Sequence, residues 1–110
     1  MIPVFYPIIF PEDDDWNLLE NNYSYDFKNK PYQFHNGGSW PIYLGWLCLG
    51  LKKRGHTKIP LKILNQYEEL LSERGSSFRE YYSTDHLIPS GTDQLCFSAS
   101  GYLMMKIDQL

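Results

Sequence analysis

The residues with the clearest chemical potential form one short loop directly in front of a proline. Residues 35–41 read HNGGSWP. His35 and Asn36 supply hydrogen-bond donors and acceptors. Gly37 and Gly38 let a ligand approach the backbone, and Trp40 supplies a flat aromatic face. A sugar needs both features, because its hydroxyl groups require directional hydrogen bonds and the C–H face of its ring packs on aromatic surfaces. The loop therefore indicates a carbohydrate site; the alternative is a tight turn that begins a helix and buries Trp40.

Metal and cofactor sites have little support in the sequence. Cys48 and Cys96 each lie within an apolar segment, and the histidines at positions 35, 56 and 86 stand at no ligand spacing from them. We therefore expect no metal and no cofactor. Both cysteines are expected to be buried, reduced thiols.

Length and charge narrow the class of protein. The chain has 110 residues and a formal net charge of −3, and its longest basic run is Lys52-Lys53-Arg54. That length fits a single domain, and that charge argues against a nucleic-acid partner. The N-terminus lacks the pattern of a signal peptide, and no segment has the length of a membrane span. These features predict a cytoplasmic protein without a membrane partner.

The elements that must position the loop are mainly helical. Pro41 is a favoured first residue of a helix, which then runs through apolar residues to Arg54 and ends before Gly55. A second helix has one apolar stripe and one polar face, and Gly75 ends it. A third follows the cap Thr92 or Asp93, and a shorter one follows Asp13 or Asp14. The predicted helices span residues 14–22, 41–54, 60–74 and 94–108.

The segments between these helices are predicted to be extended or irregular. Prolines at positions 3, 7 and 11 exclude a helix interior near the N-terminus, so this proline-rich segment should be extended. Residues 23–39 contain Asn29, Pro31, Asn36 and Gly37-Gly38, which is typical of a loop, and residues 76–90 form a polar linker loop.

Two of the predicted helices have no polar face. Residues 41–54 and 94–108 are apolar nearly all round, and residues 98–101 are all small. A helix of this kind must be covered on every side, and a row of small residues lets another helix approach closely. One amphipathic helix cannot cover both. We therefore expect their apolar faces to be covered by further chain or by self-association.

Four motifs in the same order resemble the neutral/alkaline invertases, a family of glycoside hydrolases. The HNGGSWP loop at residues 35–41 is the specific one. The others are FYP at 5–7, FREYY at 78–82, similar to a Pro-Glu-Tyr-Tyr segment of the family, and FSASGYL at 97–103, similar to its last helix. Together these motifs cover nearly the whole chain.

The resemblance implies a fold and a mechanism. It implies that residues 1–110 are a single partial catalytic domain, the C-terminal segment of an (α/α)6 toroid. Glu80 matches the family's general base, which activates water for hydrolysis with inversion. The general acid would come from an earlier helix, so the chain alone should be inactive. The implied substrate-binding residues are His35, Asn36, Gly37, Gly38, Trp40 and Tyr81.

The substrate is less well defined than the family. The invertases carry a Gly-Lys-Gln segment and a following Arg before the last helix, whereas residues 88–94 contain no Lys or Arg, and Phe97 replaces a Trp. A sucrose-like or another glucosidic substrate therefore remains open. The alternative function is a non-catalytic sugar-binding or assembly module that retains the fold, and an unrelated small helical domain is the third reading.

Overall fold

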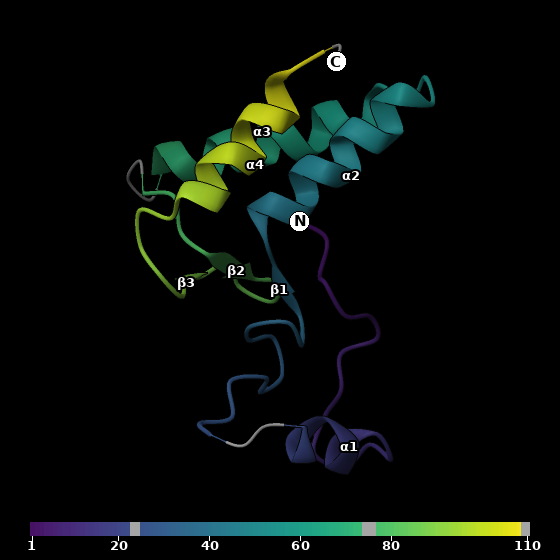
Figure 1. The fold of residues 1–110 in the computed structure, drawn as a ribbon, viewed down its shortest axis with the longest axis vertical. Helices are drawn as coiled ribbons and strands as arrows, with labels where there is room; N and C mark the ends of the chain where they lie inside the picture. Colours follow the sequence, from purple (N-terminus) through teal and green to yellow (C-terminus); the bar gives the residue numbers. More distant parts are fainter. Residues whose placement is uncertain (23–24, 74–76, 109–110) are drawn as a thin grey trace.

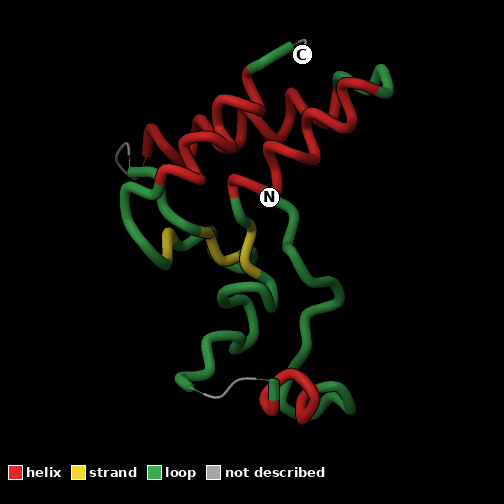
Figure 2. The backbone as a smooth tube through the Cα atoms, in the orientation of Figure 1, coloured by secondary structure: helices red, strands yellow, loops and turns green. Residues whose placement is uncertain are grey.

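The computed structural model describes residues 1–22, 25–73 and 77–108, and it is mainly helical. Three long helices form one end of the molecule: α2 (Pro41–Lys53), α3 (Lys58–Glu73) and α4 (Cys96–Lys106). Figure 1 shows α2 and α4 side by side, with α3 behind them. The short helix α1 (Trp16–Asn21) lies at the opposite end, and loops occupy most of the space between (Figure 2).

A small antiparallel sheet lies below the start of α2. Its strands are β1 (Gly38–Ser39), β2 (Tyr81–Ser83) and β3 (Pro89–Ser90), in the order β1-β2-β3. The registers are Gly38 opposite Ser83, Ser39 opposite Tyr82, and Tyr82 opposite Pro89. The central strand β2 therefore joins the HNGGSWP loop to the segment that precedes α4.

The helices α2 and α4 pack so closely that no side chain fits between them at two positions. A Cβ atom on Gly45 would lie 2.6 Å from the carbonyl oxygen of Gly101, and one on Gly101 would lie 2.2 Å from that of Pro41. The expected close helix approach at the small-residue row is thus confirmed, and its partner is α2. At the other end of α4, the ammonium of Lys52 donates to the carbonyl oxygens of Met105 (2.6 Å) and Ile107 (2.8 Å).

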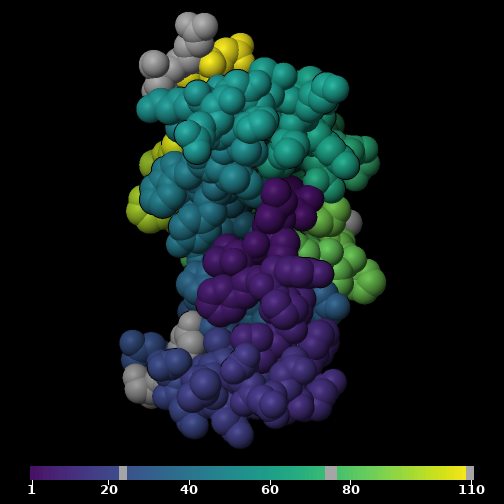
Figure 3. Space-filling model, turned by 90° about the vertical axis from the view of Figure 1, so that its right-hand side faces the viewer, coloured from purple at the N-terminus to yellow at the C-terminus, as the bar shows by residue number. Residues whose placement is uncertain are grey.

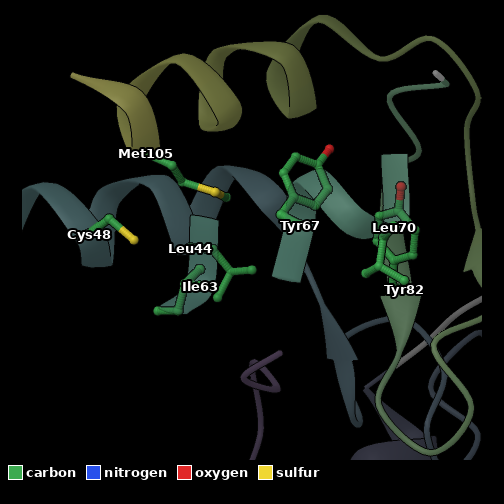
Figure 4. Packing of buried hydrophobic residues seen from close by; sticks show 7 residues of the cluster. All are labelled: Leu44, Cys48, Ile63, Tyr67, Leu70, Tyr82 and Met105. Carbon is green, nitrogen blue, oxygen red and sulfur yellow. The ribbon is translucent and has the colours of Figure 1, made fainter. Parts of the chain in front are cut away.

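The core fills the space between these helices and the sheet. Met105 points from α4 towards Leu44 and Cys48 of α2, and Tyr82 of β2 lies beside the α3 residues, with its ring 5.9 Å edge-on from Tyr67 (Figure 4). The full set of buried apolar residues in this cluster is Leu44, Cys48, Ile63, Tyr67, Leu70, Tyr82 and Met105.

The N-terminal residues run along the surface from the helices towards α1, as Figure 3 shows. The amide of Val4 donates to the carbonyl of Gly38 (3.0 Å), and that of Phe5 donates to His35 (3.1 Å). The N-terminal ammonium donates to Gln66 of α3. This segment is therefore bound to both the loop and the helical layer.

The four predicted helices are confirmed, with shifts at their ends. The first begins at Trp16, the third at Lys58 and the fourth at Cys96, and the fourth ends at Lys106. The predicted end of the third helix at Gly75 lies outside the described residues. The predicted side-chain caps are wrong: the Asp13 carboxylate accepts from the amide of Phe10 instead (2.7 Å), and Asp93 pairs with Arg79.

Two further expectations are corrected. The segments at 23–39 and 76–90, predicted to be loops, contribute the three strands. Cys48 is buried, but Cys96 is exposed. The reason is helical geometry: α4 buries Ser98, Gly101 and Met105, which share one face, and Cys96 projects from the opposite face.

Candidate functional site

Glu80 directly precedes the central strand, and the segment in front of α4 holds its carboxylate. Its Oε2 atom accepts a hydrogen bond from the amide of Thr92 (3.1 Å), and its own amide donates to the carbonyl of Thr92 (2.9 Å). The residue is half-buried. Thr92 thus holds both the backbone amide of Glu80 and one of its carboxylate oxygens.

Aromatic rings from the loop and from β2 form a cluster beside this carboxylate. The ring of His35 lies 4.3 Å from that of Phe34 and 4.9 Å from that of Trp40. Trp40 in turn stacks on Tyr81, with ring centres 5.8 Å apart and an interplanar angle of 17°. The structure therefore brings the rings of His35, Trp40 and Tyr81 together beside the Glu80 segment.

The exposure of these rings differs in a way that bears on sugar binding. Trp40 is only 9% exposed, and its Nε1 donates to the carbonyl of Phe34 (3.1 Å). Tyr81, His35 and Phe34 are half-buried. The open aromatic surface of the cluster therefore belongs to these three rings, and Trp40 supports them from behind.

Asn36, Gly37 and Gly38 are buried and shape the loop. The Asn36 side chain bridges two segments: its Oδ1 accepts from the amide of Ile9 (2.9 Å), and its Nδ2 donates to the carbonyls of Ile9 (2.7 Å) and Asn29 (3.0 Å). Gly37 has a φ of +103°, which favours glycine, and a Cβ there would meet Ile8 at 2.7 Å.

This arrangement predicts the effect of replacing Asn36. We expect Asn36→Ala to lower the free energy of unfolding by about 2–4 kcal/mol, because it removes the hydrogen-bond partner of two half-buried backbone groups of Ile9 and of the buried carbonyl of Asn29. Urea unfolding measures the change. Asn22→Ala is a matched control, because Asn22 is exposed and, among the described residues, its side chain donates to the carbonyl of Leu18 alone (2.8 Å). Equal effects of the two substitutions would contradict the bridging role of Asn36.

A cavity of about 290 Å³ opens next to the carboxylate. Glu80 is the only acidic residue among the described residues that line it. Of the lining residues, the sequence motifs include Glu80 and Tyr81. Sequence reasoning missed the others, because they belong to no motif and reach the cavity only when the chain folds. The lining residues are Phe27, Lys28, Lys30, Gln33, Phe34, Glu80, Tyr81 and Gly91.

The electrostatics of the site favour a neutral imidazole beside a carboxylate. Burial lowers the pKa of His35 below its ordinary value, and the nearby Glu80 charge opposes this shift only in part. His35 is therefore neutral at pH 7 and can both donate and accept one hydrogen bond. Arg79, next to Glu80, pairs with Asp93 at 3.5 Å. The site can bind hydroxyl groups and accept a proton at Glu80.

The described ranges also bear on metal ions and membranes. No three His, Cys, Asp or Glu side chains there gather as ligands for a metal ion. In the same residues, no helix combines the length and hydropathy that a membrane span requires.

Comparison with known proteins assigns a family to this geometry. The sequence pattern of the alkaline and neutral invertases matches residues 2–107. The mitochondrial alkaline/neutral invertase C of Arabidopsis thaliana is 37% identical over 79 residues, which cover 70% of this chain and 11% of that protein. Cytosolic invertase 1 of Oryza sativa subsp. japonica is 28% identical over 109 residues, which cover 96% of this chain and 18% of that protein. No solved structure matches.

These relatives are much longer than this chain and differ in location. The chain covers between 11% and 20% of each curated relative compared. Where their names give a location, it is mitochondrial, chloroplastic or cytosolic, so the cytoplasmic location of this chain stays a prediction. The family match covers nearly all of the chain, and it includes both the loop and Glu80. The chain therefore belongs to the alkaline and neutral invertase family of glycoside hydrolases.

Proposed function

We propose that this chain forms the base-bearing wall of an inverting glycoside hydrolase that acts on a sucrose-like or other glucosidic substrate. One observation carries the proposal: Glu80 lies at a cavity lined by aromatic and polar side chains, with one carboxylate oxygen held by Thr92. In this role residues 1–110 are a single partial catalytic domain, the C-terminal segment of a helical toroid.

The chemistry assigns a separate role to each carboxyl group. Glu80 takes a proton from a water molecule as the water oxygen attacks the anomeric carbon, while a carboxylic acid on the other side of the sugar protonates the leaving oxygen. Inverting enzymes separate the two groups by about 6.5–9.5 Å, which leaves room for the water. Glu80 is the only acid in the described lining of the cavity. The general acid must therefore come from outside this site, and the chain alone should not hydrolyse a glycoside.

The sugar contacts follow from exposure. Tyr81 lines the cavity and His35 packs on Phe34, which also lines it; both rings are half-buried, and they are proposed to contact the substrate. Trp40 stacks behind Tyr81. Asn36, Gly37 and Gly38 are buried, and they are proposed to serve binding through the shape of the loop.

Uncovered apolar surface on the helices supports the idea of a partial domain. Trp46 of α2 is 59% exposed and Phe97 of α4 is 67% exposed, and both lie on the helix pair whose other side packs on α3. Exposed apolar surface on adjacent helices is typical of an interface. We propose that the remaining helices of the toroid cover it.

One observation also fits a second function. The described lining of the cavity has one carboxylate, which is compatible with a non-catalytic sugar-binding or assembly module. In that case the apolar helix faces are covered by self-association. Such a module forms a stable oligomer and binds a sugar weakly, and Trp40→Ala abolishes that binding.

A chimaera tests the proposed function. Residues 2–107 replace the matching segment of cytosolic invertase 1 of Oryza sativa subsp. japonica, to which this chain aligns over 96% of its length. We expect the chimaera to hydrolyse sucrose or another glucoside with inversion, as ¹H NMR of the first product anomer reports. The isolated chain, studied in parallel by analytical ultracentrifugation and sugar titration, should show no hydrolysis. Cleavage by the isolated chain, or retention of configuration by the folded chimaera, would refute the proposal.

A further inference from the structure

The segment that holds the Glu80 carboxylate contains a glycine in contact with that carboxylate. Gly91 has a φ of +73°, and a Cβ atom there would lie 2.3 Å from Oε2 of Glu80 and 2.8 Å from its Cβ. We propose that Gly91 is a positioning residue for the Glu80 carboxylate, an inference that rests on the proposed role of Glu80 as the general base. The missing side chain of Gly91 leaves the space that the carboxylate occupies.

The hydrogen bond from Thr92 holds the carboxylate in this space. The amide of Thr92, the next residue, donates to the same Oε2 atom at 3.1 Å. With Oε2 engaged, Oε1 has no hydrogen-bond donor among the described residues and can accept a proton from water. A side chain at position 91 would force the carboxylate away from the Thr92 amide, and the free oxygen would then point in another direction.

The turn around Gly91 is held by hydrogen bonds on both sides. A Cβ atom at position 91 should therefore displace the Glu80 carboxylate rather than the turn. On one side, the amide of Glu80 donates to the carbonyl of Thr92 (2.9 Å), and the Arg79 guanidinium donates to that of Gly91 (3.3 Å) and pairs with Asp93 (3.5 Å). On the other side, the chain enters α4.

The backbone at the start of α4 is also held by hydrogen bonds. The amide of Leu95 donates to the carbonyl of Phe78 (2.8 Å), and the buried hydroxyl of Ser98 donates to that of Arg79 (2.7 Å). Residues 78–80 and 91–98 therefore form one braced unit. A Cβ at position 91 has no direction in which to push the backbone without breaking these bonds.

Gly55 supplies a matched control for the backbone. It has a φ of +82°, close to that of Gly91, but a Cβ there would meet nothing within 4 Å. Both Gly→Ala substitutions place alanine in the left-handed region, which costs about 1 kcal/mol of backbone strain. The difference between the two variants then isolates the contact with Glu80.

The test uses the same chimaera and reads both kinetics and stability. We expect Gly91→Ala to lower kcat by about 10–100-fold with KM nearly unchanged, because the base is displaced while the sugar contacts remain. Gly55→Ala should leave both constants unchanged. Equal kinetics for the two variants, in a chimaera that Glu80→Gln inactivates, would overturn the positioning role but leave the base assignment intact. Full activity of Glu80→Gln would instead overturn the proposed function.

A double-mutant cycle in thermal stability covers the case in which Gly91→Ala folds poorly. Glu80→Gly removes the side chain that the new Cβ would meet. We expect Gly91→Ala to lower Tm strongly in the wild-type background, and in the Glu80→Gly background only as much as Gly55→Ala lowers it. An equal drop of Tm in both backgrounds would show that Glu80 is not the contact, and the proposal would fall.

Discussion

Glu80→Gln in the chimaera lowers kcat for glycoside hydrolysis by about 10²–10⁴-fold, the usual contribution of a general base. Glutamine keeps the size of the side chain and can still accept the Thr92 hydrogen bond through its amide oxygen. It cannot take a proton from water at neutral pH. KM should change little, because the sugar contacts of Tyr81 and His35 are left in place. Initial rates over a range of substrate concentrations separate the two constants.

The control for this substitution is a glutamate of the same chain outside the cavity. Glu69 is exposed on the polar face of α3, so Glu69→Gln should leave kcat and KM unchanged. A second readout is the affinity for an unreactive sugar, which calorimetry measures and which Glu80→Gln should preserve. A folded Glu80→Gln chimaera with kcat within about threefold of the parent is incompatible with the general-base role.

The helices were predictable because their signals are local. The apolar stripe predicts α3, and Pro41 at the start and Gly55 after the end predict α2. Each of these signals lies within the helix or next to it in the sequence. Strands of two or three residues, such as β1 and β3, carry no such period. Their pairing depends on contacts between residues 38–39, 81–83 and 89–90, which only the folded chain creates.

The candidate site was predictable in part. The motifs placed Glu80 and the HNGGSWP loop in one site, and the structure brings His35 and Glu80 within electrostatic reach of each other. The motifs could not show that Asn36 is committed to the backbone of Ile9, because that bridge joins segments far apart in sequence. Gly91 escaped notice for the same reason: its importance lies in one contact with Glu80.

The positions of the loop and of the Gly91 turn depend on how α2 and α4 pack. Both helices begin at the end of the helical layer that faces the sheet (Figure 1), and Glu80 directly precedes strand β2 of that sheet. Their close packing therefore fixes the distance between the loop before α2 and the Gly91 turn before α4. Anything that separates α2 from α4 should disturb the cavity as well as the core.

Gly101→Ala tests that coupling through its effect on stability. In an unconstrained helix, Gly→Ala stabilises by about 1 kcal/mol. Here the new Cβ would lie 2.2 Å from the carbonyl oxygen of Pro41 and 2.7 Å from the amide nitrogen of Ile42, which are backbone atoms that cannot rotate away. Helices α2 and α4 would have to separate. We expect a net loss of about 1–3 kcal/mol in the free energy of unfolding, the range for overpacked cores.

Gly50→Ala is the matched control, since Gly50 also lies in a long helix but a Cβ there meets nothing within 4 Å. This variant should be more stable than the parent by up to about 1 kcal/mol, so the two substitutions should shift the guanidinium unfolding midpoint in opposite directions. If Gly101→Ala were as stable as Gly50→Ala, the helix contact would not be as close as the structure places it. The same separation should lower the activity of the chimaera, because α2 and α4 carry the two halves of the site. Loss of stability with unchanged kcat would show instead that the cavity tolerates movement of these helices.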